Sequence, residues 1–277
     1  MTNQFDIENP DKKQLKRIYN DPSVYSWSFD QLDGYKDPLD KIRMQIIIDT
    51  IQKRTISSIL DDGCGGAVIS RRLANLGYKV TGFDISKKLL DKIPKTTNLV
   101  LTTGTSEKLP FKNNSFDCVI CSEVLEHITD NHPVILEISR VVKKDGTVLV
   151  TVPNLAGYDS LDGKWKVITR PIGFVNFFLR IFKMPEVYKY GYSTHVHKLF
   201  PWQWKKILSS AGLEVTYDRP LFISPWLPDI FKFIDRFIYG IPGILKFKIW
   251  YDNLLCNIWP FRYLGQCHLF VCKPSGR

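Results

Sequence analysis

A glycine-rich segment near residue 63 has the composition of a nucleotide-binding loop. An apolar stretch is followed by a Gly-Cys-Gly-Gly segment that begins at Gly63, and apolar residues then recur at helical spacing. Glycines allow the backbone to turn sharply and to approach a ligand closely, with the start of a helix just beyond. A second apolar stretch ends at Asp84, about 20 residues later, where a carboxylate can accept hydrogen bonds from both ribose hydroxyls. We therefore expect Gly63, Gly65 and Asp84 to line a nucleoside site.

Two other interpretations of this segment fit its residues less well. An ordinary turn between a strand and a helix would also use glycine, but it would not need an acid at the end of the next strand. A dinucleotide-binding loop would place another glycine three residues after Gly65, so that helix and strand pack closely beside a pyrophosphate. Val68 stands there, and its branched side chain works against such packing. The loop suits a nucleoside without a diphosphate better.

Two carboxylates and an imidazole follow a later apolar stretch and could hold a metal ion. Glu123, Glu126 and His127 are spaced i, i+3 and i+4, so on a helical turn all three side chains point the same way. Such a set can hold Mg²⁺ or another divalent ion. Two alternatives stay open. The turn could cap a helix and line a pocket without an ion, or His127 could act as general base for a substrate hydroxyl, as histidine chemistry near neutral pH allows.

Further candidates lie downstream and on a core strand. His195 and His197 precede an expected helix and could supply a fourth metal ligand or a catalytic base from the opposite wall of the pocket. A loop histidine before a helix is more often structural or exposed to solvent. Cys118 and Cys121 have the spacing of a redox pair, but on an apolar strand they are better interpreted as packing residues.

Short apolar runs alternate with amphipathic stretches along much of the chain. Strands that alternate with helices of about ten residues form βαβ units and a parallel sheet. The expected fold is therefore α/β, a Rossmann-like doubly wound sheet with inserted helical cap segments. We expect strands at residues 58–61, 79–83, 99–102, 116–121, 147–152, 213–217 and 266–272, and helices at residues 38–53, 69–76, 86–93, 134–142 and 202–211.

The domain organisation follows from where this alternation starts and breaks. Residues 1–37 are polar with scattered aromatic residues, and we expect them to form an N-terminal lid segment. Residues 38–277 are expected to form a single domain. Two irregular, aromatic-rich stretches interrupt it at about residues 155–194 and 220–262, and these are the expected cap insertions.

Three segments of the chain resemble the class I S-adenosylmethionine-dependent methyltransferases. Residues 60–65 are similar to the first motif of these enzymes, residues 116–127 to the fourth, and residues 137–154 to the segment that follows. Within the class, the chain is most similar to the ubiquinone-biosynthesis O-methyltransferases. That likeness rests on the Gly-Cys-Gly-Gly segment, on the Leu-Glu-His segment that ends at His127, and on Arg43, which stands 20 residues before Gly63.

The resemblance implies a cofactor, S-adenosyl-L-methionine, and a set of residues that contact it. Arg43 is implied to hold the methionine carboxylate, with an ordinary helix-surface arginine as the alternative. Some quinone O-methyltransferases of this spacing use a divalent metal, which the likeness places on Glu123, Glu126 and His127. The implied cofactor contacts are Arg43, Asp61, Gly63, Cys64, Gly65, Asp84, Ile85, Ser106, Glu107 and Ser122.

The chain departs from the family pattern at two positions of the cofactor site. Ala67 replaces a usual glycine, a change that adds only a methyl group. Thr105 stands where many relatives place an acid against the adenine amine. We therefore expect the adenine contacts to come from the backbone of Ser106 and Glu107.

The composition of the chain limits the kinds of partner that it is expected to bind. With 44% hydrophobic and 24% charged residues and a formal charge of +10, the chain has the composition of a soluble globular protein that favours anionic partners. No basic block or nucleic-acid motif is present, so no nucleic-acid partner is expected. No stretch of about 20 residues lacks charge, so no helix is expected to span a bilayer. The polar start predicts a cytoplasmic protein.

Amphipathic stripes in the expected caps bear on membrane attachment. Apolar residues recur at helical spacing in residues 174–182 and 230–238, with basic residues on the other faces. These stripes predict peripheral attachment to an anionic membrane surface, and closure of a lid over substrate is the alternative.

The expected activity is methyl transfer from S-adenosylmethionine to a hydroxyl group of a small-molecule or lipid-linked, quinone-like acceptor. An N- or C-methyltransferase of a metabolite or of a lipid-linked sugar is an alternative. A non-catalytic module that binds S-adenosylmethionine is another, and the departures at Ala67 and Thr105 favour it.

Overall fold

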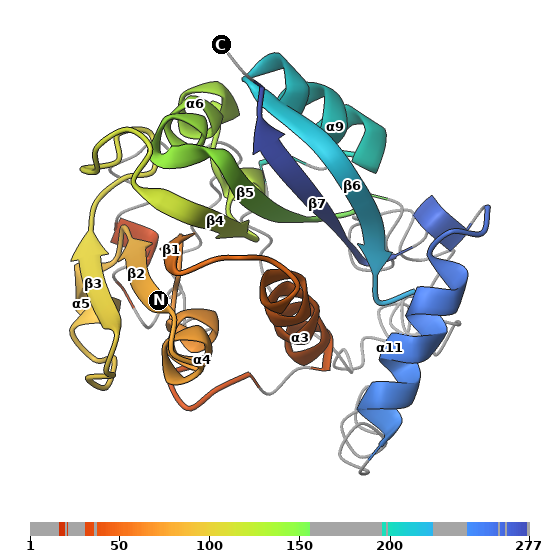
Figure 1. Cartoon of the computed structure of the whole chain (residues 1–277), viewed down its shortest axis with the longest axis horizontal. Helices are drawn as coiled ribbons and strands as arrows, with labels where there is room; N and C mark the ends of the chain where they lie inside the picture. The colour runs from red at the N-terminus through yellow and green to blue at the C-terminus, as the bar shows by residue number, and fades with distance from the viewer. Residues whose placement is uncertain are drawn as a thin grey trace, which may run out of the picture.

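A seven-stranded sheet lies at the centre of the structure, a computed structural model that describes residues 17–19, 21, 31–35, 38–155, 196–197, 199–223, 243–259, 261–263 and 265–275 (Figure 1). The strand order is β3-β2-β1-β4-β5-β7-β6. Strands β1 to β5 pair in parallel, and β7 runs antiparallel to both β5 and β6. The strands are β1 Ser58–Asp62, β2 Lys79–Asp84, β3 Leu99–Thr103, β4 Phe116–Ser122, β5 Val142–Pro153, β6 Leu213–Leu221 and β7 Cys267–Pro274. This topology confirms the expected Rossmann-like α/β fold.

Helices cover both faces of this sheet. On one face, α6 and α9 pack on a cluster that includes Val134 and Trp204, and on the other, α3 and α4 pack on a cluster that includes Ile47 and Leu73. Both faces of the sheet are therefore buried, and this explains why the sequences of its strands are nearly continuous apolar runs. The helices are α3 Pro38–Gln52, α4 Val68–Asn75, α5 Lys87–Leu90, α6 Asn131–Val141, α9 Pro201–Ser210 and α11 Ile244–Leu255, with 3-10 turns η1 Leu125–His127 and η3 Phe261–Tyr263.

Several elements differ in length from the prediction, among them β6, which continues beyond residue 217 to Leu221. Helix α5 ends at Leu90, whereas the predicted helix continued to Ile93. Pro94 disfavours a helical conformation at Ile93, but α5 ends before that residue. Strand β5 begins at Val142 because Val142 pairs with Phe116 of β4. The register then shifts, and the next paired residue of β5 is Thr147, opposite Cys118, although residues 143–146 have the composition of a turn. The order of elements is unaffected.

The cap insertions are only partly within the described residues. The first expected insertion, beyond Leu155, and both amphipathic stripes at residues 174–182 and 230–238 lie outside them. The described end of the second insertion contains α11 and η3. None of the helices in the described ranges is long and apolar enough to cross a membrane.

Candidate functional site

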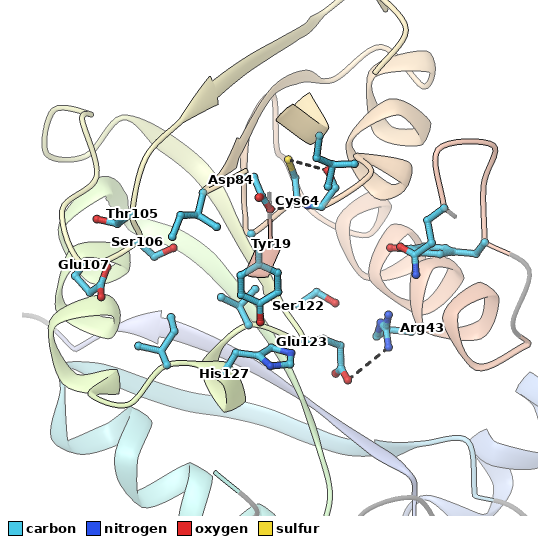
Figure 2. Close-up of a pocket in the computed structure, with 18 residues that line it drawn as sticks. Tyr19, Arg43, Cys64, Asp84, Thr105, Ser106, Glu107, Ser122, Glu123 and His127 are labelled. Atoms are coloured by element: carbon cyan, nitrogen blue, oxygen red, sulfur yellow. Dashed lines mark hydrogen bonds and ion pairs between the residues drawn. The ribbon is translucent and has the colours of Figure 1, made fainter. Parts of the chain in front are cut away.

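A pocket opens at the carboxyl ends of β1, β2 and β4, the edge where open α/β sheets bind ligands (Figure 2). It holds about 1010 Å³ of space, open solvent at its mouth included, which is enough for a nucleoside and part of a second molecule. The lining residues are Tyr19, Gln31, Tyr35, Arg43, Gly63, Cys64, Gly65, Asp84, Ile85, Leu89, Thr105, Ser106, Glu107, Ser122, Glu123, Val124, His127 and Ile128.

The glycine loop has a backbone that only glycine adopts easily at Gly63. Its φ is +76°, and a Cβ added there would lie 2.3 Å from Cγ2 of Val124. The backbone N–H groups of Gly63 and Cys64 both donate to the carbonyl of Phe83, at 2.8 and 3.0 Å. The loop therefore lies against the ends of β2 and β4. Ala67, which replaces the usual glycine, caps α4 in the left-handed region with φ +51°.

Asp84, at the end of β2, closes the loop from the other side. One oxygen of its carboxylate accepts the N–H of Gly65 at 2.9 Å, and the other accepts the N–H of Ser86 at 2.8 Å. Burial raises the pKa of Asp84, and the backbone hydrogen bonds work against that shift. Each carboxylate oxygen can accept a further hydrogen bond, so a diol at this point in the pocket could be held by both.

Two more acids lie beneath the loop. Asp61 is buried and accepts a hydrogen bond from Ser70 Oγ at 2.5 Å, and it is absent from the pocket lining. Asp62 is fully buried, and its Oδ1 accepts a hydrogen bond from Ser106 Oγ at 2.7 Å. Burial raises the pKa of Asp61 to about 6 and that of Asp62 to about 7. The structure thus places Asp61, a predicted cofactor contact, in a supporting position.

Arg43 of α3 reaches the pocket from its far end (Figure 2). It is 3% exposed, and its guanidinium lies 2.6 Å from Asp40 and 3.7 Å from Glu123. Burial acts to lower the pKa of Arg43, but Asp40 and Glu123 outweigh it and raise the pKa. Nε of Arg43 has no hydrogen-bond partner among the described residues. The predicted helix-surface alternative is therefore wrong, because the side chain is buried at the pocket.

Glu123 is held by a network at the end of β4. Its Oε1 accepts hydrogen bonds from Thr151 Oγ1 at 3.0 Å and from the thiol of Cys267 at 3.1 Å. Ser122 lies beside it, with its hydroxyl 2.8 Å from that of Thr151. The backbone of Glu123 has φ +58°, in the left-handed region.

This backbone corrects the predicted helical turn of Glu123, Glu126 and His127. Only residues 125–127 form a turn of 3-10 helix, because Glu123 is in the left-handed conformation. Glu126 is fully buried and turned away from the pocket, while Glu123 and His127 line it. Within the described ranges, no group of three or more His, Cys, Asp or Glu side chains could hold a metal ion. The predicted metal site on these three residues is therefore not supported.

Glu126 and His127 nevertheless form a pair. Nε2 of His127 lies 3.7 Å from Oε1 of Glu126, and neither oxygen of this carboxyl has a hydrogen-bond partner among the described residues. Burial is the largest cause that raises the pKa of Glu126, and the nearby Glu123 adds to it. The ring of Tyr19 lies edge-on to that of His127, with 6.1 Å between the centroids.

Of the two downstream histidines, His197 is described and does not line the pocket. Nε2 of His197 lies 3.1 Å from the carbonyl of Thr129, and its ring packs against Trp204, so it is absent from the lining. His195 lies outside the described residues. Cys118 and Cys121 are fully buried on β4, as expected of packing residues.

Several lining residues carry no motif and were missed. Tyr19, Gln31 and Tyr35 come from the segment ahead of α3, where only scattered aromatic residues hinted at a cover over something. Thr105 lines the pocket beside Ser106 and Glu107, at the end opposite Arg43 (Figure 2). The segment after β3 therefore contributes side chains at three consecutive positions.

About half of the chain is similar in sequence to known proteins. Residues 60–150 match a family described as a methyltransferase domain. A ubiquinone biosynthesis O-methyltransferase of Vibrio atlanticus is 30% identical over 156 residues, which make up 53% of this chain and 64% of that protein. The match thus spans less than two thirds of that relative's length.

Solved structures share the architecture over most of the chain. The crystal structure of the 4+2 cyclase SpnF has a TM-score of 0.60 at 15% identity and covers 96% of this chain and 98% of its own. The methyltransferase from the complex with the Haloferax volcanii Trm112 methyltransferase activator has a TM-score of 0.56 at 14% identity, covering 93% and 98%. At such identities these structures bear on the fold alone.

Proposed function

We propose, from the premise that this chain carries a class I S-adenosylmethionine-dependent methyltransferase domain, that it transfers a methyl group to a hydroxyl oxygen of a small-molecule or lipid-linked, quinone-like acceptor. The observation that carries the proposal is that the glycine loop, the Asp84 carboxylate and His127 all line one pocket. The name of the Vibrio relative supports an oxygen acceptor.

The residues of the pocket fit the cofactor from end to end. Asp84 would accept the ribose hydroxyls, and Gly63 and Gly65 would allow the nucleoside to approach the backbone. Thr105, Ser106 and Glu107 would contact the adenine, and Cys64, Ile85 and Ser122 would complete the wall. At the other end, the buried Nε–H of Arg43 is the donor left for the methionine carboxylate.

The acceptor hydroxyl must lose its proton, and His127, which lines the pocket, would take it. When bound, S-adenosylmethionine supplies a methyl group on a cationic sulfur that needs no further activation. His127 would accept the proton through the ring nitrogen that does not face Glu126. The carboxyl of Glu126, 3.7 Å from the imidazole, gains a favourable partner for ionisation once His127 is cationic. Tyr19 against the ring would help to exclude water.

Two other functions are compatible with the same cofactor site. An N- or C-methyltransferase, including one acting on a lipid-linked sugar, would use the same loop with a different acceptor. A module that binds S-adenosylmethionine without transferring its methyl group would retain Asp84 but not need His127. The fold does not decide between them, since a cyclase has the same architecture.

We also propose that the protein works in the cytoplasm and attaches peripherally to anionic membrane surfaces. The formal charge of +10 and six free cysteines support this location. Helix α11 adds an apolar stripe on which Phe247 is 58% exposed, Trp250 57% and Leu254 54%. Such a stripe suits the interface between water and lipid.

Calorimetric titration with S-adenosylmethionine and S-adenosylhomocysteine tests the cofactor site. We expect both to bind to the wild type and Asp84→Ala to bind roughly 10- to 100-fold more weakly. Asp91→Ala, at an exposed acid after α5, is the matched control and should bind normally. If neither nucleoside binds to the folded wild type, the proposal fails. A panel of phenolic, amine and sugar acceptors then distinguishes the functions, and binding without turnover on any of them would favour the non-catalytic module.

A further inference from the structure

A second pocket lies on the side of the domain formed by α3, β6, β7 and α11 (Figure 1). It holds about 630 Å³, open solvent at its mouth included. It shares no residue with the pocket around Asp84. Its polar walls come from Thr50 of α3, from Lys53 and Arg54 just after that helix, from Tyr217 and Arg219 of β6, and from Asn253 of α11.

Three cations of this pocket have no carboxylate partner within the described part of the chain. Lys53, Arg54 and Arg219 form no ion pair there, unlike Lys87, Arg140, Lys143 and Arg262, each of which pairs with a nearby acid. Arg54 bonds to the carbonyl of Thr50, which leaves its charge uncompensated.

Arg219 is the most informative of the three because it is buried. It is only 8% exposed, and its side chain donates to Asn253 Oδ1 at 2.5 Å and to the carbonyl of Pro220 at 3.3 Å, both neutral acceptors. Its Nη2 has no hydrogen-bond partner among the described residues. Asp252 attracts Arg219 without forming an ion pair with it and is itself paired with Lys248, so an anion brought to this place would be bound with a gain in free energy.

The acids near Arg219 are engaged by other groups. Asp252 forms a buried ion pair with Lys248, which also donates to the carbonyl of Ile223. Asp49, the acid that lines the pocket, accepts a hydrogen bond from Gln45 Nε2 at 2.7 Å. The pocket wall therefore has three positive charges against the one negative charge of Asp49.

We propose that this pocket binds the phosphate group of a phosphomonoester or phosphodiester. Arginine donates two parallel hydrogen bonds to phosphate oxygens, and lysine adds a point charge, so the wall has the donors that phosphate requires. Tyr217 adds a hydroxyl group. The group could belong to a soluble compound or to a phospholipid head, since the exposed Phe247 and Trp250 lie on α11, the helix that also contributes Asn253.

The experiment compares two double variants with the same change in charge. Lys53→Gln/Arg54→Gln removes two exposed cations of the pocket, and Lys112→Gln/Lys144→Gln removes two exposed cations elsewhere. Inorganic phosphate is titrated at constant ionic strength and followed by calorimetry and thermal unfolding. Flotation with vesicles of phosphatidylcholine, with and without phosphatidylglycerol, is measured in parallel, with inorganic phosphate as competitor.

We expect saturable binding of one phosphate per chain, at least about tenfold weaker in Lys53→Gln/Arg54→Gln and unchanged in Lys112→Gln/Lys144→Gln. Vesicle binding that requires phosphatidylglycerol and is displaced by phosphate would identify a lipid head as the source. Phosphate binding without such vesicle binding would identify a soluble compound. Arg219→Gln, if it folds, should lose binding altogether.

The proposal is overturned if neither probe binds, or if both double variants weaken binding equally, because general charge then explains the effect. Titration of S-adenosylhomocysteine into every variant keeps this result separate from the proposed methyl transfer. That titration should be unchanged in both double variants, since none of the four residues lines the first pocket.

Discussion

The carboxylate of Asp84 accepts a hydrogen bond from the backbone N–H of Gly65 at 2.9 Å, and this bond joins the end of β2 to the loop that follows β1. The same loop packs against Val124, just after β4, at Gly63. Three strand ends therefore meet around a single bend of the backbone. The shape of the pocket depends on that bend, so small changes in the loop should affect both stability and ligand binding.

Gly63→Ala should destabilise the protein and weaken binding of S-adenosylhomocysteine. The new Cβ would lie 2.3 Å from Cγ2 of Val124, and the alanine would have to adopt a φ of +76°. The steric clash and the backbone strain together should lower the free energy of unfolding by about 2–4 kcal/mol. Urea unfolding measures the loss of stability, and calorimetry measures the loss of affinity.

Gly77→Ala is the matched control, because φ there is +96° and nothing lies within 4 Å of the added Cβ. Backbone strain alone should lower its free energy of unfolding by about 1–2 kcal/mol, and its affinity for the nucleoside should be unchanged. The combination of Gly63→Ala with Val124→Ala should lose less stability than the sum of the two single variants. Strict additivity would contradict the contact.

Because of Asp62, the free energy of unfolding should decrease as the pH rises from about 4 to about 7. The pKa of an unfolded aspartate is about 4, whereas burial raises the pKa of Asp62 to about 7, so the folded chain binds more protons in this window. Its free energy of unfolding therefore decreases as the pH rises. Urea unfolding at several pH values should show a smaller decrease for Asp62→Asn than for the wild type.

Asp117→Asn provides a control of opposite sign. Burial is the largest single effect on the pKa of Asp117 and acts to raise it, but the hydrogen bonds from Lys143, Ser58 and Ser57 together outweigh it and lower the pKa. The stability that Asp117 contributes is present above the pKa of an unfolded aspartate and is lost as the pH falls below it. Asp117→Asn should therefore change how the free energy of unfolding depends on pH only below the pKa of an unfolded aspartate. Equal slopes for Asp62→Asn and wild type between pH 4 and pH 7 would refute the assignment.

His127→Gln should lower kcat by roughly 10²- to 10⁴-fold while leaving the affinity for S-adenosylhomocysteine within about threefold. Glu126→Gln should give a smaller loss and shift the pH profile of kcat, because the carboxyl acts through the imidazole 3.7 Å away. Initial rates with the best hydroxyl acceptor measure both effects. His132→Gln, at an exposed histidine of α6, should retain full activity. Full activity in His127→Gln would exclude it as the base.

Phe247→Ser/Trp250→Ser should reduce flotation with anionic vesicles severalfold and leave the thermal midpoint nearly unchanged. Both side chains are more than half exposed, so their loss removes little packing. Val100→Ser/Leu136→Ser changes two exposed apolar residues away from α11 and should float like the wild type. Equal flotation of all three proteins would argue against α11 as the attachment surface.

Much of the fold could be predicted from local patterns. Each strand from β1 to β4 is a short apolar run bounded by turn residues, and α4 carries its apolar residues on one side, with Ile69 and Leu73 buried. The partners of the glycine loop could also be predicted. The loop follows β1, its contacts Phe83 and Asp84 end β2, and these two strands are parallel neighbours in the sheet. Strands that follow one another in the sequence commonly lie side by side, so the loop and Asp84 were expected to meet.

Predictions that relied on an assumed local conformation failed more often. The spacing of Glu123, Glu126 and His127 suggests one helical face, but Glu123 lies in the left-handed region and Glu126 turns into the core. A spacing rule holds only if the backbone is helical throughout. Here the contacts of Glu123 with Thr151 and Cys267 accompany a different backbone, and both partners are distant in the sequence.

The sequence by itself determined the sheet, the glycine loop and the acid that faces it, because these depend on interactions between neighbouring elements. Only the tertiary structure decided that Tyr19 and Gln31 enter the first pocket and that Arg54, Arg219 and Asn253 meet in the second. These residues come from segments far apart in the chain, and no periodic pattern records which of them will meet. Their positions follow from how α3 and α11 pack on the sheet, which depends on the shapes of many side chains together.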